Sequence, residues 1–175
     1  MMNFWKNSIG IMILIKQDIS KHDNEGLWEY YLPEVGANEA DIKEIENFFG
    51  FPLDKYYREF LTYANGWKSF YQSVDLFGTK EICSNSIMTY TNYILNSLEE
   101  AVLTNSGFSR DELFPIGSTK DDKDLFVITK HNSKNPGMII WYAGEEIDRF
   151  SNFKDFFLAM TEYNREELKY LKGEE

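Results

Sequence analysis

Residues 41–67, DIKEIENFFGFPLDKYYREFLTYANGW, predict two short helices separated by a sharp break. Asn38 is a candidate N-cap for the first helix, because its side chain can accept a hydrogen bond from a free backbone N–H. Gly50 and Pro52 end that helix, since glycine enters the left-handed conformation cheaply and proline cannot continue a helix. The apolar residues of this half predict one inward-facing stripe, formed by Ile42, Ile45, Phe48 and Phe49.

The second half of the segment repeats the pattern. Its apolar residues recur at i, i+3, i+4 and i+7, and they are Tyr57, Phe60, Leu61 and Ala64. Asn65 and Gly66 follow as a helix stop. Two helices whose stripes face the same core are expected to nucleate the rest of the fold.

Composition and charge restrict the classes of function. The chain has 175 residues, which predicts one domain, and its 43% hydrophobic and 17% aromatic content argues against disorder. The net charge of −11 disfavours direct binding to nucleic acid or to an anionic membrane, and it favours a basic protein partner. The alternative is that the acidity only keeps the protein soluble. The apolar run 9–15 is shorter than the ~20 residues of a membrane span, so a cytoplasmic protein is expected.

The remaining elements follow from periodicity. We expect helices at 2–20, 88–103 and from 153 onward, strands at 70–77, 125–129, 138–142 and 146–150, and a short aromatic element at 27–32. A strand is the alternative for the first of these helices. Clustered strands predict an α+β fold: a mostly antiparallel or mixed sheet packed against N-terminal helices and a C-terminal helix.

The sequence contains no catalytic signature, and we expect no catalytic, cofactor or metal site. His22 and His131 are predicted in polar loops without a nearby nucleophile. The acidic run at 121–124 lacks the glycine and the distal glutamate of a calcium loop, which favours a solvated turn. Cys83 is expected to be a small buried side chain. An unrecognised hydrolase remains an alternative.

A binding surface is the more plausible kind of site. Tyrosine and tryptophan often anchor interfaces, and acidic side chains would meet a basic partner. The candidates are Trp67, Tyr71, Asp75, Asp121, Asp122, Asp124, Glu145, Glu146 and Asp148. Tyr90 and Trp141 are further aromatic candidates. The competing interpretation is that these aromatic residues only fill the core.

The segment 41–67 also resembles the signature of the SUKH superfamily, the Smi/Knr-type family of bacterial immunity proteins and fungal cell-wall regulators. The matching residues are Ile42, Ile45, Glu46, Gly50, Pro52, Leu53, Tyr57, Phe60, Leu61, Asn65 and Gly66. The motifs at 76–78, 114–117 and 151–157, and Trp141, are similar to later landmarks of that family. The resemblance covers about 28–160 of a single SUKH-like domain spanning 1–175. It leaves 1–27 as an N-terminal extension and 161–175 as a charged helix end.

The resemblance implies an α+β fold without catalysis. It implies an immunity protein that binds a secreted toxin, such as a basic nuclease domain, and neutralises it by occluding the active surface. The alternative that it leaves open is a scaffold or regulatory binding module of the cell-wall type.

Overall fold

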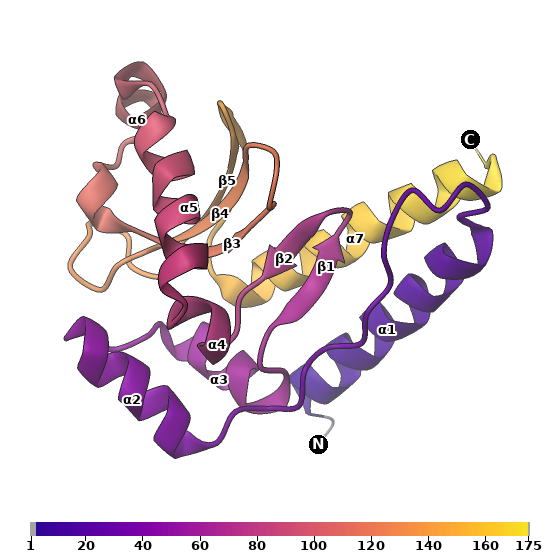
Figure 1. Ribbon diagram of the computed structural model, residues 1–175, viewed down its shortest axis with the longest axis horizontal. Coiled ribbons are helices and arrows are strands. Elements are labelled where there is room, and N and C mark those ends of the chain that lie inside the picture. The colour runs from indigo at the N-terminus through magenta and orange to yellow at the C-terminus, as the bar shows by residue number, and fades with distance from the viewer. Residues whose placement is uncertain (1–2, 175) are drawn as a thin grey trace.

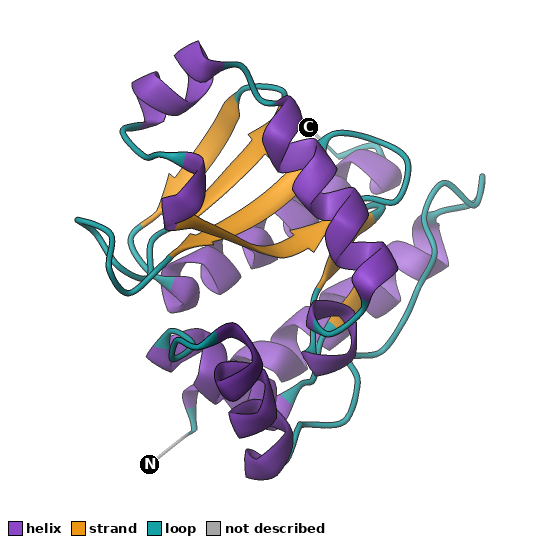
Figure 2. Ribbon diagram, turned by 60° about the vertical axis from the view of Figure 1, so that its left-hand side comes forward, coloured by secondary structure: helices purple, strands orange, loops and turns teal. Residues whose placement is uncertain are grey.

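The computed structural model describes residues 3–174, and its centre is a six-stranded antiparallel sheet (Figures 1 and 2). The strands pair in chain order from β1 to β6. They are β1 (Trp67–Tyr71), β2 (Val74–Leu76), β3 (Leu113–Ser118), β4 (Asp124–Thr129), β5 (Ile139–Ala143) and β6 (Glu146–Phe150). Each pairing is antiparallel, so the predicted α+β class is confirmed and no parallel pair occurs among the described strands.

Helices cover both faces of this sheet, as Figure 2 shows. The helices are α1 (Phe4–His22), α2 (Glu39–Phe49), α3 (Lys55–Tyr63), α4 (Thr79–Ile82), α5 (Asn85–Ser97), α6 (Glu100–Ser106) and α7 (Phe153–Lys172). Successive side chains of β4 point to opposite faces of the sheet, and each face has its own core. Phe126 belongs to the core that includes α1, α3 and α7, whereas Val127 belongs to the core that includes α5 and α6. The C-terminal and N-terminal helices therefore cover only one face of the sheet.

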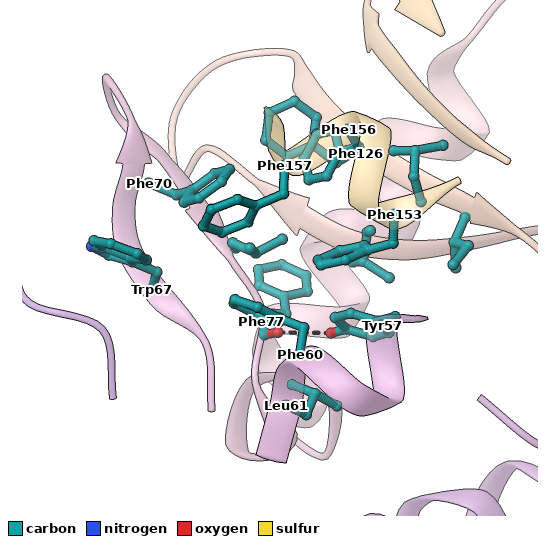
Figure 3. Close-up of a cluster of buried hydrophobic side chains, with 14 of the residues drawn as sticks. Tyr57, Phe60, Leu61, Trp67, Phe70, Phe77, Phe126, Phe153, Phe156 and Phe157 are labelled. Atoms are coloured by element: carbon teal, nitrogen blue, oxygen red, sulfur yellow. Dashed lines mark hydrogen bonds between the residues drawn. The ribbon is translucent and has the colours of Figure 1, made fainter. Parts of the chain in front are cut away.

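The larger core is built from aromatic rings (Figure 3). Phe157 of α7 packs against Phe60 of α3 with ring centroids 5.7 Å apart, and against Phe70 of β1 at 5.5 Å. Below them, the hydroxyl of Tyr57 donates a hydrogen bond of 2.7 Å to the carbonyl oxygen of Phe77. This buried bond ties α3 to the chain that leaves β2, and Ile42 and Ile45 of α2 belong to the same core.

The predicted helix ends are confirmed, with one error in the apolar stripe. The Asn38 side chain accepts from the backbone N–H of Asp41, and Gly50 is left-handed with φ of 73°. Phe48 was wrongly predicted to face inward, because its side chain is 73% exposed. Phe48 follows Ile42 by six residues, and each residue turns the helix by ~100°. The two side chains therefore point about 120° apart around the helix axis.

The N-terminal helix is confirmed over the described residues. Helix α1 begins at Phe4, with Asn3 as its N-cap, and runs to His22, which is therefore helical and not in a loop. The prediction began at residue 2, and residues 1, 2 and 175 lie outside the described part. The charged end predicted for the last helix is part of α7, which ends at a left-handed Gly173.

Three predicted elements differ from the structure, two of them because a turn or an extended residue interrupts the periodicity. The strand expected at 70–77 is the β1–β2 hairpin, in which Tyr71 pairs with Val74 across a two-residue turn and Gln72 has φ of 50°. The helix expected at 88–103 is two helices, because Leu98 adopts an extended conformation between α5 and α6. Residues 27–32 form no regular element.

One smaller prediction was also wrong. Cys83 is exposed and not buried, since it lies just beyond the end of α4. The landmark at residues 114–117 is part of β3.

Asn65 and Gly66 do more than stop a helix. The Asn65 side chain accepts from the backbone N–H of Thr79 at 2.7 Å and donates to the Thr79 hydroxyl at 2.8 Å. The backbone of the pair lies against Gly78, where a Cβ atom would come within 2.0 Å of the Asn65 carbonyl oxygen. The chain segments before β1 and after β2 therefore touch through backbone, which a side chain at Gly78 would prevent.

Replacing Gly78 with alanine is expected to lower the free energy of unfolding by several kcal/mol, on the order of the larger measured effects of single mutations. The reason is that the clashing partner is backbone and cannot rotate away. Gly10→Ala is the matched control: nothing lies within 4 Å of a Cβ at this position in α1, so it is expected to stabilise by about 0.5–1 kcal/mol. Urea unfolding of both variants measures the difference. Equal effects of the two substitutions would contradict the close approach.

Lys16 of α1 is buried beside the outer edge of β1. Its ammonium donates to the carbonyl oxygen of Ser69, and Asn164 of α7 donates to the carbonyl of Phe70 at 3.3 Å. Both bonds satisfy carbonyls that an edge strand leaves free, and the helices cover that edge. Burial lowers the pKa of Lys16 to about 8, and the nearby Glu167 opposes this shift.

This pKa makes stability depend on pH. Because the pKa of Lys16 is lower in the folded state than its ordinary value of 10.5, the folded protein binds fewer protons between pH 8 and 10, and stability rises with pH there. Between pH 7 and 9.5 we expect a gain of about 2 kcal/mol in the free energy of unfolding. Lys16→Met is expected to abolish this rise, as measured by urea unfolding across that range. A rise of the same size in the variant would refute the assignment to Lys16.

Candidate protein-binding surface

The antiparallel order of the strands brings three turns to one end of the sheet. These turns comprise residues 72–73, 119–123 and 144–145, and we call this the turn end. The second and third turns touch, since a Cβ atom at Gly144 would lie 3.8 Å from the side chain of Lys123. Segments up to 73 residues apart in sequence therefore form one surface.

Three of the predicted acidic residues are exposed on the turn end. Asp121 and Asp122 lie in the β3–β4 turn, and Glu145 lies in the neighbouring β5–β6 turn. Among residues 3–174, none of the three has a basic partner within 4 Å. Lys120 and Lys123 lie in the same turn as the two aspartates. The carboxylates are thus available to an incoming partner.

The half-buried Asp124 and the buried Trp141 form a hydrogen-bonded pair just inside this surface. The indole N–H of Trp141 donates to the Asp124 carboxylate at 2.7 Å. Burial raises the pKa of Asp124, the hydrogen bond from Trp141 opposes the shift, and the charge of Asp122 adds to it. The protein therefore holds a carboxylate where the surroundings disfavour its charge.

An aromatic cluster underlies the same end of the sheet. The rings of Tyr71, Trp141 and Tyr163 pack edge to face, with centroids 5.3–5.8 Å apart. The Tyr163 hydroxyl donates to Asp148 at 2.8 Å, and burial, this hydrogen bond and the Asp148 charge raise the pKa of Tyr163 to about 12. Tyr163 therefore remains a neutral donor that holds Asp148 in place.

A polar cleft of about 450 Å³ opens beside the hairpin tip. Asp75 and Asp121 both line it, together with Leu27, Trp28, Glu29, Ser69, Gln72, Ser73 and Lys120. Asp75 is partly engaged, because it accepts from the backbone N–H of Ser69 at 2.8 Å. Glu167 braces the rim by accepting from Trp28 at 2.7 Å and from Gln72 at 3.0 Å. The cleft has a fixed polar wall that faces solvent.

The structure brings most of the predicted residues together, but not all are accessible. Trp67 is 1% exposed, and its indole donates to the carbonyl of Tyr31, so its side chain belongs to the core. The Trp141 ring is likewise 7% exposed. Glu146 lies at this end of the sheet in an ion pair with Arg149. Tyr90 reaches the same surface, where its hydroxyl donates to the carbonyl of Asp122 at 3.2 Å.

Sequence reasoning missed the contribution of α7 and of the segment before α2. Tyr163 and Glu167 lie seven and eleven residues after Phe156. This helical spacing puts all three on one face, so they were detectable from the sequence. Trp28 and Gln72 carried no signal, because their contact with Glu167 depends on tertiary packing.

Other chemistry finds little support in the described part of the chain. No three histidine, cysteine or acidic side chains within residues 3–174 are placed to hold a metal ion. His22 bonds to the carbonyl of Asp18 at 2.8 Å, and His131 stacks on Phe51 with ring centroids 5.9 Å apart. No helix in residues 3–174 has the length and apolar character needed to cross a membrane.

Asp124→Asn tests whether the negative charge of Asp124, which pairs with Trp141, lowers the stability of the folded protein. A raised folded-state pKa means that stability is lost as pH rises through it, so removing the charge is expected to stabilise the protein at pH 7 and to do so less at pH 4. The asparagine carbonyl keeps an acceptor for Trp141. Thermal unfolding at both values of pH checks this. A destabilised variant at pH 7 would contradict the expectation.

Comparison with known proteins places these features in a family. No curated protein matches the chain in sequence. The model of the SMI1 / KNR4 family (SUKH-1) matches residues 36–159, a stretch that runs from the entry to α2 into α7 and contains all six strands. The match covers well over half of the 175 residues, and it agrees with the resemblance seen in residues 41–67. The chain belongs to the SMI1 / KNR4 family (SUKH-1).

Proposed function

We propose that the protein is an immunity protein that binds a cognate secreted toxin and neutralises it inside the producing cell. The toxin is a basic protein, such as a nuclease domain, and the inhibitor acts in the cytoplasm. It has no catalytic activity of its own and takes no cofactor. Family membership and the charge of −11 support this assignment.

The observation that carries the proposal is the acidic turn end. Asp121, Asp122 and Glu145 project from adjacent turns without basic partners in the described chain. A nuclease domain presents cationic groups where it holds phosphate, so such a surface is complementary to the turn end. The exposed carboxylates increase the rate of association, because attraction between unlike charges steers the two proteins together.

The interior of the turn end supplies rigidity. Tyr71, Trp141 and Tyr163 all pack against one another, while Asp124 and Asp148 each accept a hydrogen bond from an aromatic side chain. Groups that are already fixed lose little entropy on binding. The cleft beside Asp75 offers a recess for a basic side chain of the toxin. Inhibition follows by occlusion, since a toxin covered at its cationic surface cannot reach phosphate.

The test begins with any candidate toxin gene found beside the gene for this chain. The two proteins are expected to copurify with one-to-one stoichiometry, and the complex is expected to lack the toxin's activity. Binding without inhibition would overturn the proposal and favour a scaffold. Loss of an activity of this chain itself on substituting one carboxylate would point to a hydrolase.

Asp121→Asn combined with Asp122→Asn is expected to slow association with the toxin by about three- to tenfold at low salt, and by less at 0.5 M salt, because exposed charges are screened there. Stopped-flow fluorescence measures both rates. Glu44→Gln combined with Glu99→Gln removes the same charge from exposed sites on α2 and just before α6. Equal slowing by the two double variants would remove the turn end as the docking surface.

A further inference from the structure

A second cavity lies at the opposite end of the sheet. It has a volume of about 260 Å³ and opens between the break from α2 to α3 and the loop from β4 to β5. Its walls are mostly apolar and aromatic: Phe51, Pro52, Leu53, Tyr57, Phe114 and Ile128. We call it the aromatic pocket. Its size is below the ~300 Å³ of typical small-molecule sites and suits a single inserted side chain.

A chain of rings connects this pocket to the surface. Phe48 is 73% exposed, and its ring centroid lies 5.0 Å from that of Phe49. Phe49 in turn packs on Phe114 at 5.0 Å, and Phe114 on Phe51 at 5.4 Å. Single exposed apolar residues are common on protein surfaces, but Phe48 is joined to an apolar cavity by a row of packed rings. It therefore enlarges one continuous apolar patch.

The rim of the pocket is basic although the protein is acidic. Lys55 and Lys130 line it, and within residues 3–174 neither has a carboxylate within 4 Å. Lys130 lies over the Phe51 ring, 5.7 Å from its centroid. Outside the pocket, the pKa of the exposed Asp111 is lowered by its hydrogen bond with Ser109 and, to a smaller extent, by the charge of Lys130.

One carboxylate, Asp54, also lines the pocket, so the lining carries two positive charges and one negative charge. Asp54 is the N-cap of α3, and its Oδ1 accepts from the backbone N–H groups of Tyr56 at 2.9 Å and Tyr57 at 3.1 Å. Its other oxygen faces Gly137, where a Cβ atom would lie 2.5 Å away. Lys55 lies over the Tyr56 ring, 4.5 Å from its centroid, and Lys130 over Phe51. Since neither lysine is in an ion pair within residues 3–174, the net positive charge of the lining can attract a negative charge from outside.

We propose that the aromatic pocket binds a short acidic segment of a partner protein, which inserts one phenylalanine-like side chain while its carboxylates meet Lys55 and Lys130. The size of the cavity selects a single side chain, and the charge of the rim selects acidic neighbours. This site has the opposite charge preference to the turn end and lies at the other end of the sheet. It therefore goes beyond toxin neutralisation and stands or falls independently of it.

The test uses a fluorescein-labelled peptide of sequence EDFDE and measures fluorescence anisotropy against the full chain. Saturable binding is expected. Replacing the peptide's phenylalanine with serine, or its acidic residues with their amides, is expected to weaken binding at least fivefold. An unchanged affinity after either replacement, or no binding of the original peptide, would overturn the proposal.

Matched lysine variants locate the site. Lys130→Glu is expected to weaken peptide binding at least fivefold, whereas Lys123→Glu, the same charge reversal at the turn end, is expected to change it less than twofold. Phe48→Ser on the exposed approach is expected to weaken binding about threefold, in line with the loss of an apolar contact of ~0.7 kcal/mol. Thermal unfolding confirms that each variant is folded. Equal weakening by the two lysine variants would show nonspecific attraction and refute the site.

Discussion

The backbone contact between Asn65-Gly66 and Gly78-Thr79 is the constraint on which the arrangement of the fold depends. It joins the chain that enters β1 to the chain that leaves β2, so it closes the base of the first hairpin. The neighbouring bond from Tyr57 to the carbonyl of Phe77 fixes α3 against the same point (Figure 3). With the base held, the hairpin tip at residues 72–73 can lie only at the turn end, where it forms a wall of the polar cleft.

The antiparallel meander gives the two ends of the sheet different chemistry. One end collects three short turns, which carry unpaired carboxylates over a rigid aromatic cluster. The other end receives the break between α2 and α3 and the long loop after β4, which enclose an apolar pocket with a basic rim. Since the ends are separated by the length of the strands, one domain can present two surfaces of opposite charge preference.

Parts of the chain outside the family match contribute to the core and to the site. Helix α1 lies along α7 (Figure 1), and both helices supply donors to the carbonyls of the edge strand β1. The C-terminal half of α7 also supplies Glu167, which braces the rim of the cleft. The buried Lys16 and the half-buried Asp124 are both charged groups in surroundings that disfavour charge. Lys16 donates to Ser69, and Asp124 accepts from Trp141 and adjoins the exposed acidic turn.

The sequence by itself determined the local elements. The cap at Asn38, the left-handed Gly50 and the stripe of α3 follow from hydrogen bonding and periodicity within a few residues, and they were predictable for that reason. The resemblance of residues 41–67 to the family also predicted the family and, with it, the α+β class. Acidic and aromatic candidate residues could be named, although their accessibility could not.

Only the tertiary structure decided how these elements meet. The turn at Gln72 lies inside an alternating pattern that a single strand would share, so the hairpin was not visible locally. Trp67 and Tyr71 belong to one short strand, yet Trp67 is 1% exposed while Tyr71 is half-buried at the turn end. Burial and convergence depend on strand order and register, which bring residues distant in sequence together. Contacts such as that of Trp28 with Glu167 produce no periodic pattern in the sequence, because the two residues meet only in the folded chain.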